Sequence, residues 1–347
     1  MKSIWTSKRF LFGFIYLFSI LTASFIYGWY FKSDTLKPLL LLYNENKDLI
    51  GAAPFSPVQM PPLGSDRFGE SIFYQLLDGA KFTILFALII ALLRTVFSAI
   101  LGIIISLYVK PCKKIIKAFS EVFYYVPTVF IAAILILPVN VNIDSSVNRL
   151  EPNVSFAIYQ AIILILVALP TVSLFISSEI DEFMKTDYIL SSKLMGASRF
   201  HILKKHLRVL LRERLFILFM EHVVQTLILM IHLSLIQIVI GGAQVKDMGD
   251  GRIKLVSMSN DWAGLIGLNY YEINIAIWII LGTLIAFFIT ILVIKFMISG
   301  IQDALNVQKS VIKVENRDFK EESYKQNKES FTFASKEQSS YHSSINM

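Results

Sequence analysis

Four polar side chains lie within long apolar stretches of the sequence, where they could contact a solute. Arg94 interrupts one stretch, and Glu221, Gln225 and His232 share a later one. Gln225 follows Glu221 by four residues and His232 follows it by eleven, which puts all three on one face of a helix. Ionisable groups are costly in an apolar layer, so they mark a path or an ion pair. We therefore predict that this face looks into the protein.

The depths of Arg94 and Glu221 predict an ion pair. At a helical rise of about 1.5 Å per residue, Arg94 lies about 18 Å from one side of its stretch and Glu221 about 10 Å from the opposite side. In an apolar layer about 30 Å thick, the two side chains therefore lie at about the same level. The pair would face a solute path or close it. Alternatively, either side chain reaches an interface or finds its partner elsewhere.

Other chemistry has little support in the sequence. Glu221, His222 and His232 suggest a metal site, but His222 points away from the other two, so we predict no bound metal. The single cysteine, Cys112, excludes an internal disulfide and a multi-cysteine metal site. We recognise no Ser/His/Asp set, His-Glu-x-x-His helix or converging carboxylate pair. We therefore expect neither an enzyme nor a cofactor.

The polar segment 179–213 lies between two apolar stretches. It lacks proline and is interrupted by Gly196, which predicts two short helices hinged at a glycine. The small Ser191 and Ser192 lie beside apolar Leu194 and Met195. A short helix with an exposed apolar edge suits docking into a groove on another protein. The spacing fits an amphipathic linker on a lipid surface equally well.

The composition places these residues in a membrane protein. The chain is 55% apolar and 17% charged, with a mean hydropathy of +0.60, which lies outside the usual range of soluble proteins. Six stretches are long enough to cross a bilayer, and we predict an all-α membrane protein with six transmembrane helices. The stretches are Phe10–Phe31, Phe82–Val109, Glu121–Asn140, Val154–Ser178, Arg214–Ile240 and Glu272–Met297. Pro127 and Pro170 predict kinks that line a cavity or serve packing.

The positive charges predict the orientation. Most of the 33 lysines and arginines lie before the first stretch, at 110–118, at 179–214 and from Lys295 onward. Because positive residues near span ends stay in the cytoplasm, we predict that both termini are cytoplasmic. The same distribution explains the net charge of +7, so we predict no nucleic-acid partner.

The pattern of apolar stretches and polar loops divides the chain into four parts. Residues 1–31 form an anchor helix, which is too long for a signal peptide and lacks a small-x-small cleavage site. Residues 32–81 form an outer loop interrupted by prolines. Residues 82–306 form the transmembrane domain that includes the 179–213 segment. Residues 307–347 are rich in Lys, Glu, Ser and Gln and are predicted to be a disordered cytoplasmic tail.

The 179–213 segment resembles the cytoplasmic coupling loop of ABC importer permeases. In the family pattern two alanines precede a glycine, and Ser191, Ser192 and Gly196 fall on these positions. The resemblance is closest to the C-type permease subunit of oligopeptide, dipeptide and nickel importers, where His206 falls on a histidine. Leu190 replaces the acidic residue of the pattern and Val209 replaces a later proline.

Further segments resemble the same family in the same order, over about residues 60–306. They are Pro62-Leu63-Gly64-Ser65-Asp66-Arg67-Phe68-Gly69, Gly79-Ala80-Lys81, Tyr125-Val126-Pro127-Thr128, Leu169-Pro170, Asn260-Asp261-Trp262-Ala263-Gly264 and Gly300-Ile301-Gln302-Asp303-Ala304-Leu305. Glu70 and Ser71 stand where the family has an Arg-Asp pair.

The resemblance implies a type I ABC importer permease fold in a bacterial plasma membrane. It implies four kinds of partner besides membrane lipid: a second permease subunit, two cytoplasmic ATPase subunits, an extracellular substrate-binding protein and a transported solute. The ATPase-coupling residues would be Tyr188, Ser191, Ser192, Lys193, Met195, Gly196, Ala197, Ser198, Arg199 and His206. Candidates for the translocation path are Arg94, Pro127, Pro170, Glu221, Gln225 and His232.

The substrate stays open at this stage. The resemblance implies di- and oligopeptides first, with nickel or a metal chelate as the alternative within the same family. A rival from another class is a secondary transporter or channel driven by an ion gradient, with Arg94, Glu221 and His232 as a charge relay. No inverted repeat is recognisable in the sequence, which argues against that rival.

Overall fold

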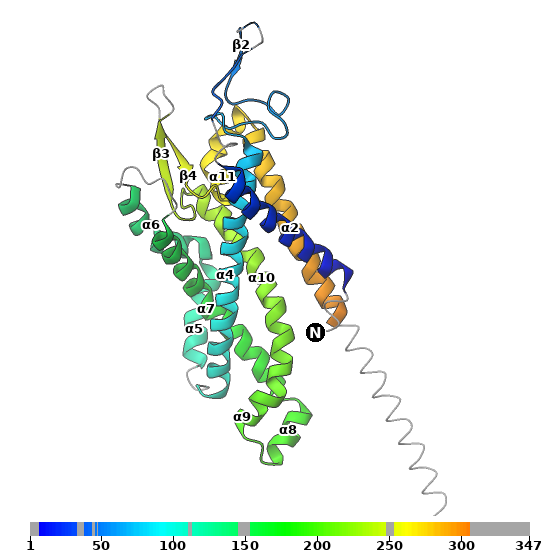
Figure 1. Cartoon of the computed structure of the whole chain (residues 1–347). Coiled ribbons are helices and arrows are strands. Elements are labelled where there is room, and N and C mark those ends of the chain that lie inside the picture. Colours follow the sequence, from blue (N-terminus) through cyan, green and yellow to red (C-terminus); the bar gives the residue numbers. More distant parts are fainter. Residues whose placement is uncertain are drawn as a thin grey trace, which may run out of the picture.

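A computed structural model describes residues 7–32, 38–43, 46, 48–109, 113–144, 153–247 and 253–305. The predicted tail 307–347 lies outside these residues. The described chain is mostly helical (Figure 1). Its long helices run between two β-hairpins at one end and the short helices α8 and α9 at the other.

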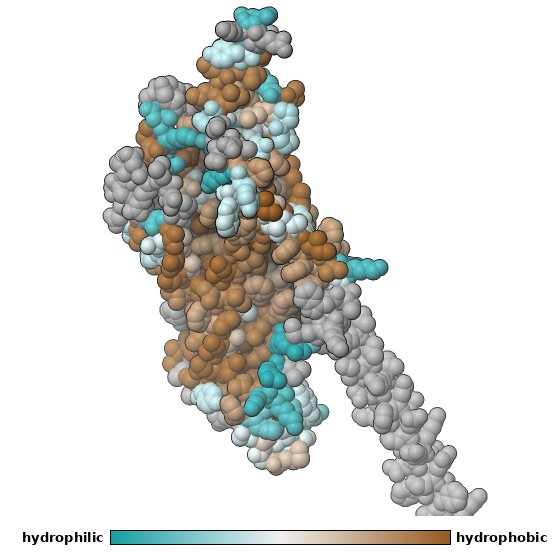
Figure 2. All heavy atoms as spheres, viewed as in Figure 1, coloured by the Kyte–Doolittle hydropathy of each residue, from teal (hydrophilic) through white to brown (hydrophobic). Residues whose placement is uncertain are grey.

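Five described helices are long and apolar enough to cross a membrane. On the face seen in Figure 2, hydrophobic residues cover the middle of the helices, with hydrophilic residues toward both ends. This confirms the predicted all-α membrane class, whereas the cytoplasmic position of the termini stays a prediction. The five helices are α2 (Lys8–Tyr30), α4 (Ile72–Leu107), α7 (Val154–Phe183), α10 (Arg208–Leu235) and the unlabelled helix Trp278–Leu305.

The predicted span Glu121–Asn140 is not one continuous helix. The structure divides this region into α5 (Lys113–Tyr125) and α6 (Thr128–Asp144), with Pro127 between them. Proline lacks the N–H that a helix interior needs and disfavours helical geometry at the preceding residue, which explains the break. The apolar part of α6 is shorter than the five long helices.

Helix α4 is the central packing element. It begins ten residues earlier than predicted, so the loop predicted at 32–81 ends at Ser71. Its 36 residues extend about 54 Å, well beyond a hydrocarbon core of about 30 Å. Helix α4 packs against α2, α7 and α10. Ala87, Ile90 and Ala91 are completely buried on it, because their small or branched side chains fit between these neighbours.

Helix α2 packs along the carboxyl-terminal helix. A Cβ atom added at Gly13 would overlap the Met297 side chain, so the two helices approach closely there. Tyr16 Oη lies 3.3 Å from Thr290 Oγ1, and Arg9 forms a 2.6 Å ion pair with Asp303. The first described turn of α2 and the last turn of helix Trp278–Leu305 therefore lie at the same end of the bundle (Figure 1).

Two antiparallel hairpins and two short helices cover the opposite end of the bundle. The first hairpin pairs Leu41 with Ala52, and the second pairs Ala243 with Ser257. Ion pairs tie the second hairpin to its surroundings, since Lys246 bonds Glu70 and Lys254 bonds Glu272. The elements are β1 (Leu41–Tyr43), β2 (Leu49–Ala52), β3 (Ala243–Asp247), β4 (Ile253–Ser257), α11 (Trp262–Asn269) and the 3-10 helix η3 (Tyr270–Asn274).

Asp66 is a buried carboxylate in the turn before α4. It accepts hydrogen bonds from the backbone N–H groups of Phe68 and Glu70 and from the Gln75 side chain. Burial, with the nearby charge of Glu70, outweighs these bonds and raises the pKa of Asp66 to about 6. A buried acid with a raised pKa stabilises the fold most when it is protonated.

Asp66 is expected to make stability depend on pH. Because its folded-state pKa exceeds the ordinary value of 3.8, its contribution is full below pH 3.8 and is lost as pH rises to about 6. Asp66→Asn, which imitates the protonated form, should flatten this part of the profile. The melting temperature of the purified protein between about pH 4 and pH 7 measures the effect. The exposed Asp48→Asn serves as the control and should keep the wild-type profile.

Candidate functional site

The predicted glycine hinge is a defined turn between two helices. Helix α8 (Asp187–Leu194) ends two residues before Gly196, whose φ of +86° lies in the left-handed region. Gly196 N–H donates to the Lys193 carbonyl, and Ala197 N–H donates to the Ser192 carbonyl. These two bonds form a Schellman motif, which satisfies carbonyls at a helix end. The glycine therefore fixes the direction in which the chain leaves α8.

The second helix begins directly after this turn. The Ser198 hydroxyl accepts a hydrogen bond from His201 N–H, so Ser198 is the N-cap of α9 (Arg199–Ile202). Helix α9 continues through a π-helical turn, η2 (Leu203–Leu207), into α10. The sequence predicts two separate short helices, whereas the second is the first part of α10. A force on α9 is therefore applied directly to α10.

The Gly196 turn carries an exposed apolar tip. Leu194 is 85% exposed, Met195 82% and Phe200 65%. A Cβ atom added at Gly196 would meet no other atom within 4 Å, so the chain itself leaves this space open. We call Leu194, Met195 and Phe200 the apolar tip. Exposed large apolar side chains gathered in one place mark an interaction surface.

The opposite face of this segment holds it against the bundle. Ile189, Ile202 and Leu207 are buried. The Tyr188 ring contacts the rings of Phe183 and His206, each with centroids 5.6 Å apart. These contacts join the end of α7, helix α8 and η2 into one packed unit.

Of the remaining predicted coupling residues, some are buried or hold the segment together and others are exposed. Ser192 is buried, whereas the Ser191 hydroxyl donates to the Asp187 carbonyl on the exposed side. Lys193 Nζ donates to the Met184 carbonyl and so ties α8 to the end of α7. Ala197 lies in the turn, half-buried, and the side chain of Arg199 lies outside the described part of the chain. Sequence reasoning did not select Phe200, although an aromatic residue in a polar segment was a usable signal.

A cleft of about 460 Å³ lies among α4, α6, α7 and α10. Four of the predicted path residues line it, namely Arg94, Pro127, Gln225 and His232. Gln225 and His232 lie on one face of α10, as their spacing predicts, but this face is exposed, so the prediction that it looks into the protein is wrong for this chain. Exposed polar groups in a membrane helix are unfavourable against lipid. This face of α10 therefore requires a cover that is more polar than lipid.

Two predicted path residues do not line this cleft. Glu221 is half-buried on α10. Pro170 lies inside α7, which continues as a helix across it. The Ser173 hydroxyl donates to the carbonyls of Leu169 and Pro170 and so bonds backbone groups beside the proline.

The predicted ion pair between Arg94 and Glu221 is wrong. Arg94 Nε and Nη2 both donate to the Leu164 carbonyl, at 2.8 and 2.5 Å. Arg94 Nη1 donates to the Thr226 hydroxyl at 3.2 Å. Within the described residues Arg94 forms no ion pair. A backbone carbonyl of α7 and a hydroxyl on α10 hold the guanidinium instead of a carboxylate.

Metal-ligating side chains do not gather at this site. Across the described ranges no three His, Cys, Asp or Glu residues are placed to hold an ion. The buried His222 bonds Gln225 through Nδ1 at 3.0 Å.

Residues 98–308 match the family of binding-protein-dependent transport system inner membrane components. The chain belongs to this family. The matched residues include most of the cleft, the apolar tip and the helices on both sides of it. This inner membrane component is a multi-pass plasma-membrane protein with a role in transport rather than catalysis. None of the proteins with curated descriptions is significantly similar to it.

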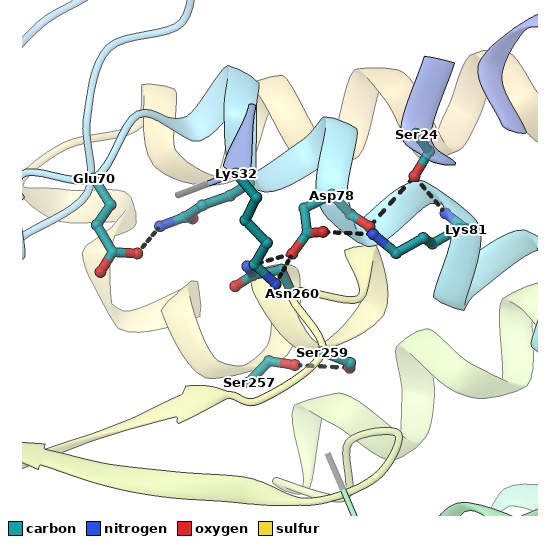
Figure 3. Close-up of polar contacts among 9 residues, drawn as sticks. Ser24, Lys32, Glu70, Asp78, Lys81, Ser257, Ser259 and Asn260 are labelled. Carbon is teal, nitrogen blue, oxygen red and sulfur yellow. Dashed lines mark hydrogen bonds and ion pairs between the residues drawn. The ribbon is translucent and has the colours of Figure 1, made fainter. Parts of the chain in front are cut away.

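A polar cluster joins two helices and a turn at the hairpin end of this inner membrane component (Figure 3). The buried Asp78 carboxylate on α4 bonds Lys81 Nζ at 2.6 Å and Lys32 Nζ at 2.8 Å. Asn260 Nδ2 lies 3.3 Å from the same carboxylate, and the Ser24 hydroxyl accepts from Lys81 N–H. The cluster thus joins α2, α4 and the turn before α11.

Asp78→Asn is expected to lower the stability of this inner membrane component by on the order of 1–2 kcal/mol, because two ammonium groups lose their carboxylate. The partial exposure of Lys32 keeps the effect below that of a fully buried pair. Asp303→Asn, which breaks the exposed pair with Arg9, should change stability by less than about 0.5 kcal/mol. Thermal unfolding of the detergent-solubilised variants measures both. Equal effects would contradict a role for the buried cluster.

Proposed function

We propose that this chain is the transmembrane permease subunit of an ATP-driven importer for di- and oligopeptides. It forms half of the translocation path with a second permease subunit. Two cytoplasmic ATPase subunits dock on the apolar tip, and an extracellular substrate-binding protein delivers the solute. The exposed apolar tip, joined directly to two long helices, is the observation that carries this proposal.

The packing of the segment supports a mechanical role. Helix α8 follows α7 after a short turn and is tied back to it by Lys193, while α9 runs into α10 without a break. Glu179 on α7 and Arg214 on α10 form a 3.1 Å ion pair, which joins the two helices near the segment that carries the tip. When the ATPase subunits close around ATP, they would displace the tip and move α7 and α10 with it. The closure of the ATPase subunits around ATP would thus change the arrangement of the membrane helices.

The cleft supports pairing with a second permease. Gln225 and His232 are exposed on the α10 face, together with the apolar Ile228 between them. A second subunit would cover this face and enclose the cleft as a path between the two chains. Polar residues at the bundle interior are the usual arrangement in membrane proteins.

Transport in vesicles tests the proposal. The complex, purified through a tag on this chain, is reconstituted with its binding protein, and uptake of labelled dialanine and tetra-alanine is measured with and without ATP. ATP-dependent uptake of either peptide is the expected result. Uptake that follows an imposed ion gradient without ATP would favour a secondary transporter. ATP-dependent uptake of nickel, with none of either peptide, would assign the metal alternative.

A further inference from the structure

Arg94 carries a buried charge without a counter-ion in the described part of the chain. Its side chain is 3% exposed, and it lies well inside α4. Both of its bonding partners, the Leu164 carbonyl and the Thr226 hydroxyl, are neutral. Removing a charge from water without a charged partner is unfavourable. The arrangement is therefore suited to an anion that arrives from elsewhere.

The guanidinium keeps two N–H groups that no described residue bonds. Arginine has five N–H donors, and three of them are used in the bonds to Leu164 and Thr226. The described residues provide no acceptor for the other two. Arg94 also lines the 460 Å³ cleft, so an oxygen atom of a solute in the cleft can approach the guanidinium.

The rest of the cleft suits a solute that is polar at one point and apolar elsewhere. Val129, Val167, Val172, Ile228 and Leu229 line it together with Gln225, His232 and two threonines. Gln225 and His232 lie on the same helix and provide hydrogen bonds without a carboxylate. No acidic side chain lines the cleft within the described residues, so an anion there meets no like charge.

We propose that Arg94 binds the carboxylate of the transported solute as it passes through the cleft. This inference rests on the proposed importer function and adds the substrate class, a small molecule with a free carboxylate and apolar substituents. Thr226 is a positioning residue, because its hydroxyl accepts from Arg94 Nη1 while it donates to the His222 carbonyl at 2.7 Å. The Leu164 carbonyl fixes the other side of the guanidinium.

Paired substrates in the reconstituted complex test the proposal. Uptake of labelled tri-alanine is compared with uptake of tri-alanine carboxamide, in the wild type and in Arg94→Gln. Because the binding protein is the same throughout, its own preference cancels when the acid-to-amide ratio is compared between variants. Arg94→Gln should lower this ratio about tenfold, since hydrogen bonds to charged groups are stronger than neutral ones. Arg94→Lys should keep most of the preference for the acid.

The controls separate this inference from the proposed function. Thr226→Val removes the hydroxyl that positions the Arg94 guanidinium but keeps its charge, so it should lower the acid-to-amide ratio by less than Arg94→Gln does. An Arg94→Gln complex that imports both peptides with an unchanged ratio would overturn the carboxylate site but leave the importer function intact. No ATP-dependent uptake of either peptide by the wild type would instead overturn the importer function for peptides.

A measurement on the wild-type complex keeps the proposal testable if Arg94→Gln does not assemble. A tripeptide of benzoylphenylalanine followed by two alanines is photolysed in the complex without its binding protein, so that the preference of the binding protein does not enter, and the labelled residues are mapped by mass spectrometry. Residues that line the cleft should be labelled, and tri-alanine should suppress this labelling at least about tenfold more effectively than its carboxamide. Equal suppression by the two competitors would overturn the proposal.

Discussion

Gly196→Arg is expected to abolish recovery of the ATPase subunits with the tagged permease. The chain leaves open space around Gly196, so a larger side chain there would meet a docked partner rather than this chain. The apolar tip on either side of the turn would then carry a bulky cation where close approach is needed. The amount of ATPase subunit that co-purifies from native membranes measures the effect, and we expect a loss of more than about tenfold.

Gly196→Asn is the matched control for this variant. Asparagine tolerates the left-handed region better than other side chains, so the turn at φ +86° is kept with little strain. It also adds only a short neutral side chain, and most of the ATPase should still be recovered. If the arginine variant recovers ATPase subunits as well as the wild type, the docking surface lies elsewhere.

Gly79→Ala is expected to destabilise the permease by about 3 kcal/mol, a large effect for one methyl group. A Cβ atom at this position would lie 1.7 Å from the Asn260 carbonyl oxygen, which belongs to backbone and cannot rotate away. Either α4 or the turn before α11 must move, and Asn260 is also part of the Asp78 cluster. Thermal unfolding of the detergent-solubilised protein measures the loss.

Gly282→Ala provides the comparison within another membrane helix. The added Cβ would lie 3.3 Å from a methyl group of Leu63, and this flexible side chain can adjust. Because alanine also has the higher helix propensity, the variant should stay within about 1 kcal/mol of the wild type. Similar unfolding temperatures for the two variants would show that the approach of α4 to Asn260 is not the constraint described.

The long apolar helices could be predicted because bilayer thickness sets their length, but their ends could not. Helix α4 continues through the polar Asp78 and Lys81, which bond each other, and the Asp78 carboxylate also bonds Lys32. Hydropathy alone assigns these residues to a loop, since it does not show that their charges are paired. In the third predicted span, the break at Pro127 was signalled by the proline itself. Its extent depends on packing, which the sequence does not show.

The cleft was predicted better than the partner of its arginine. Helical periodicity was enough to place Gln225 and His232 on one face of α10. The partner of Arg94 was predicted wrongly because charge reasoning considers only side chains, whereas the structure offers the Leu164 carbonyl. Backbone acceptors carry no signal in the sequence.

The 179–213 segment shows the same limit. Gly196 predicted the turn, because few other residues adopt its φ. The continuity of α9 with α10 depends on the π-helical turn Leu203–Leu207, which no simple pattern predicts. Packing decides which apolar side chains of the segment are exposed, because Ile189 is buried whereas Leu194 on the same short helix is exposed.

The central claim is that the apolar tip contacts an ATPase subunit, and photo-crosslinking in intact cells tests it most directly. Benzoylphenylalanine is introduced in place of Met195, which is exposed at the tip, or in place of the buried Ile189 as the control. The Met195 position should crosslink to an ATPase subunit, and the Ile189 position should crosslink only within this chain. A Met195 position that crosslinks to lipid or to an extracellular protein, and never to an ATPase, would contradict the claim.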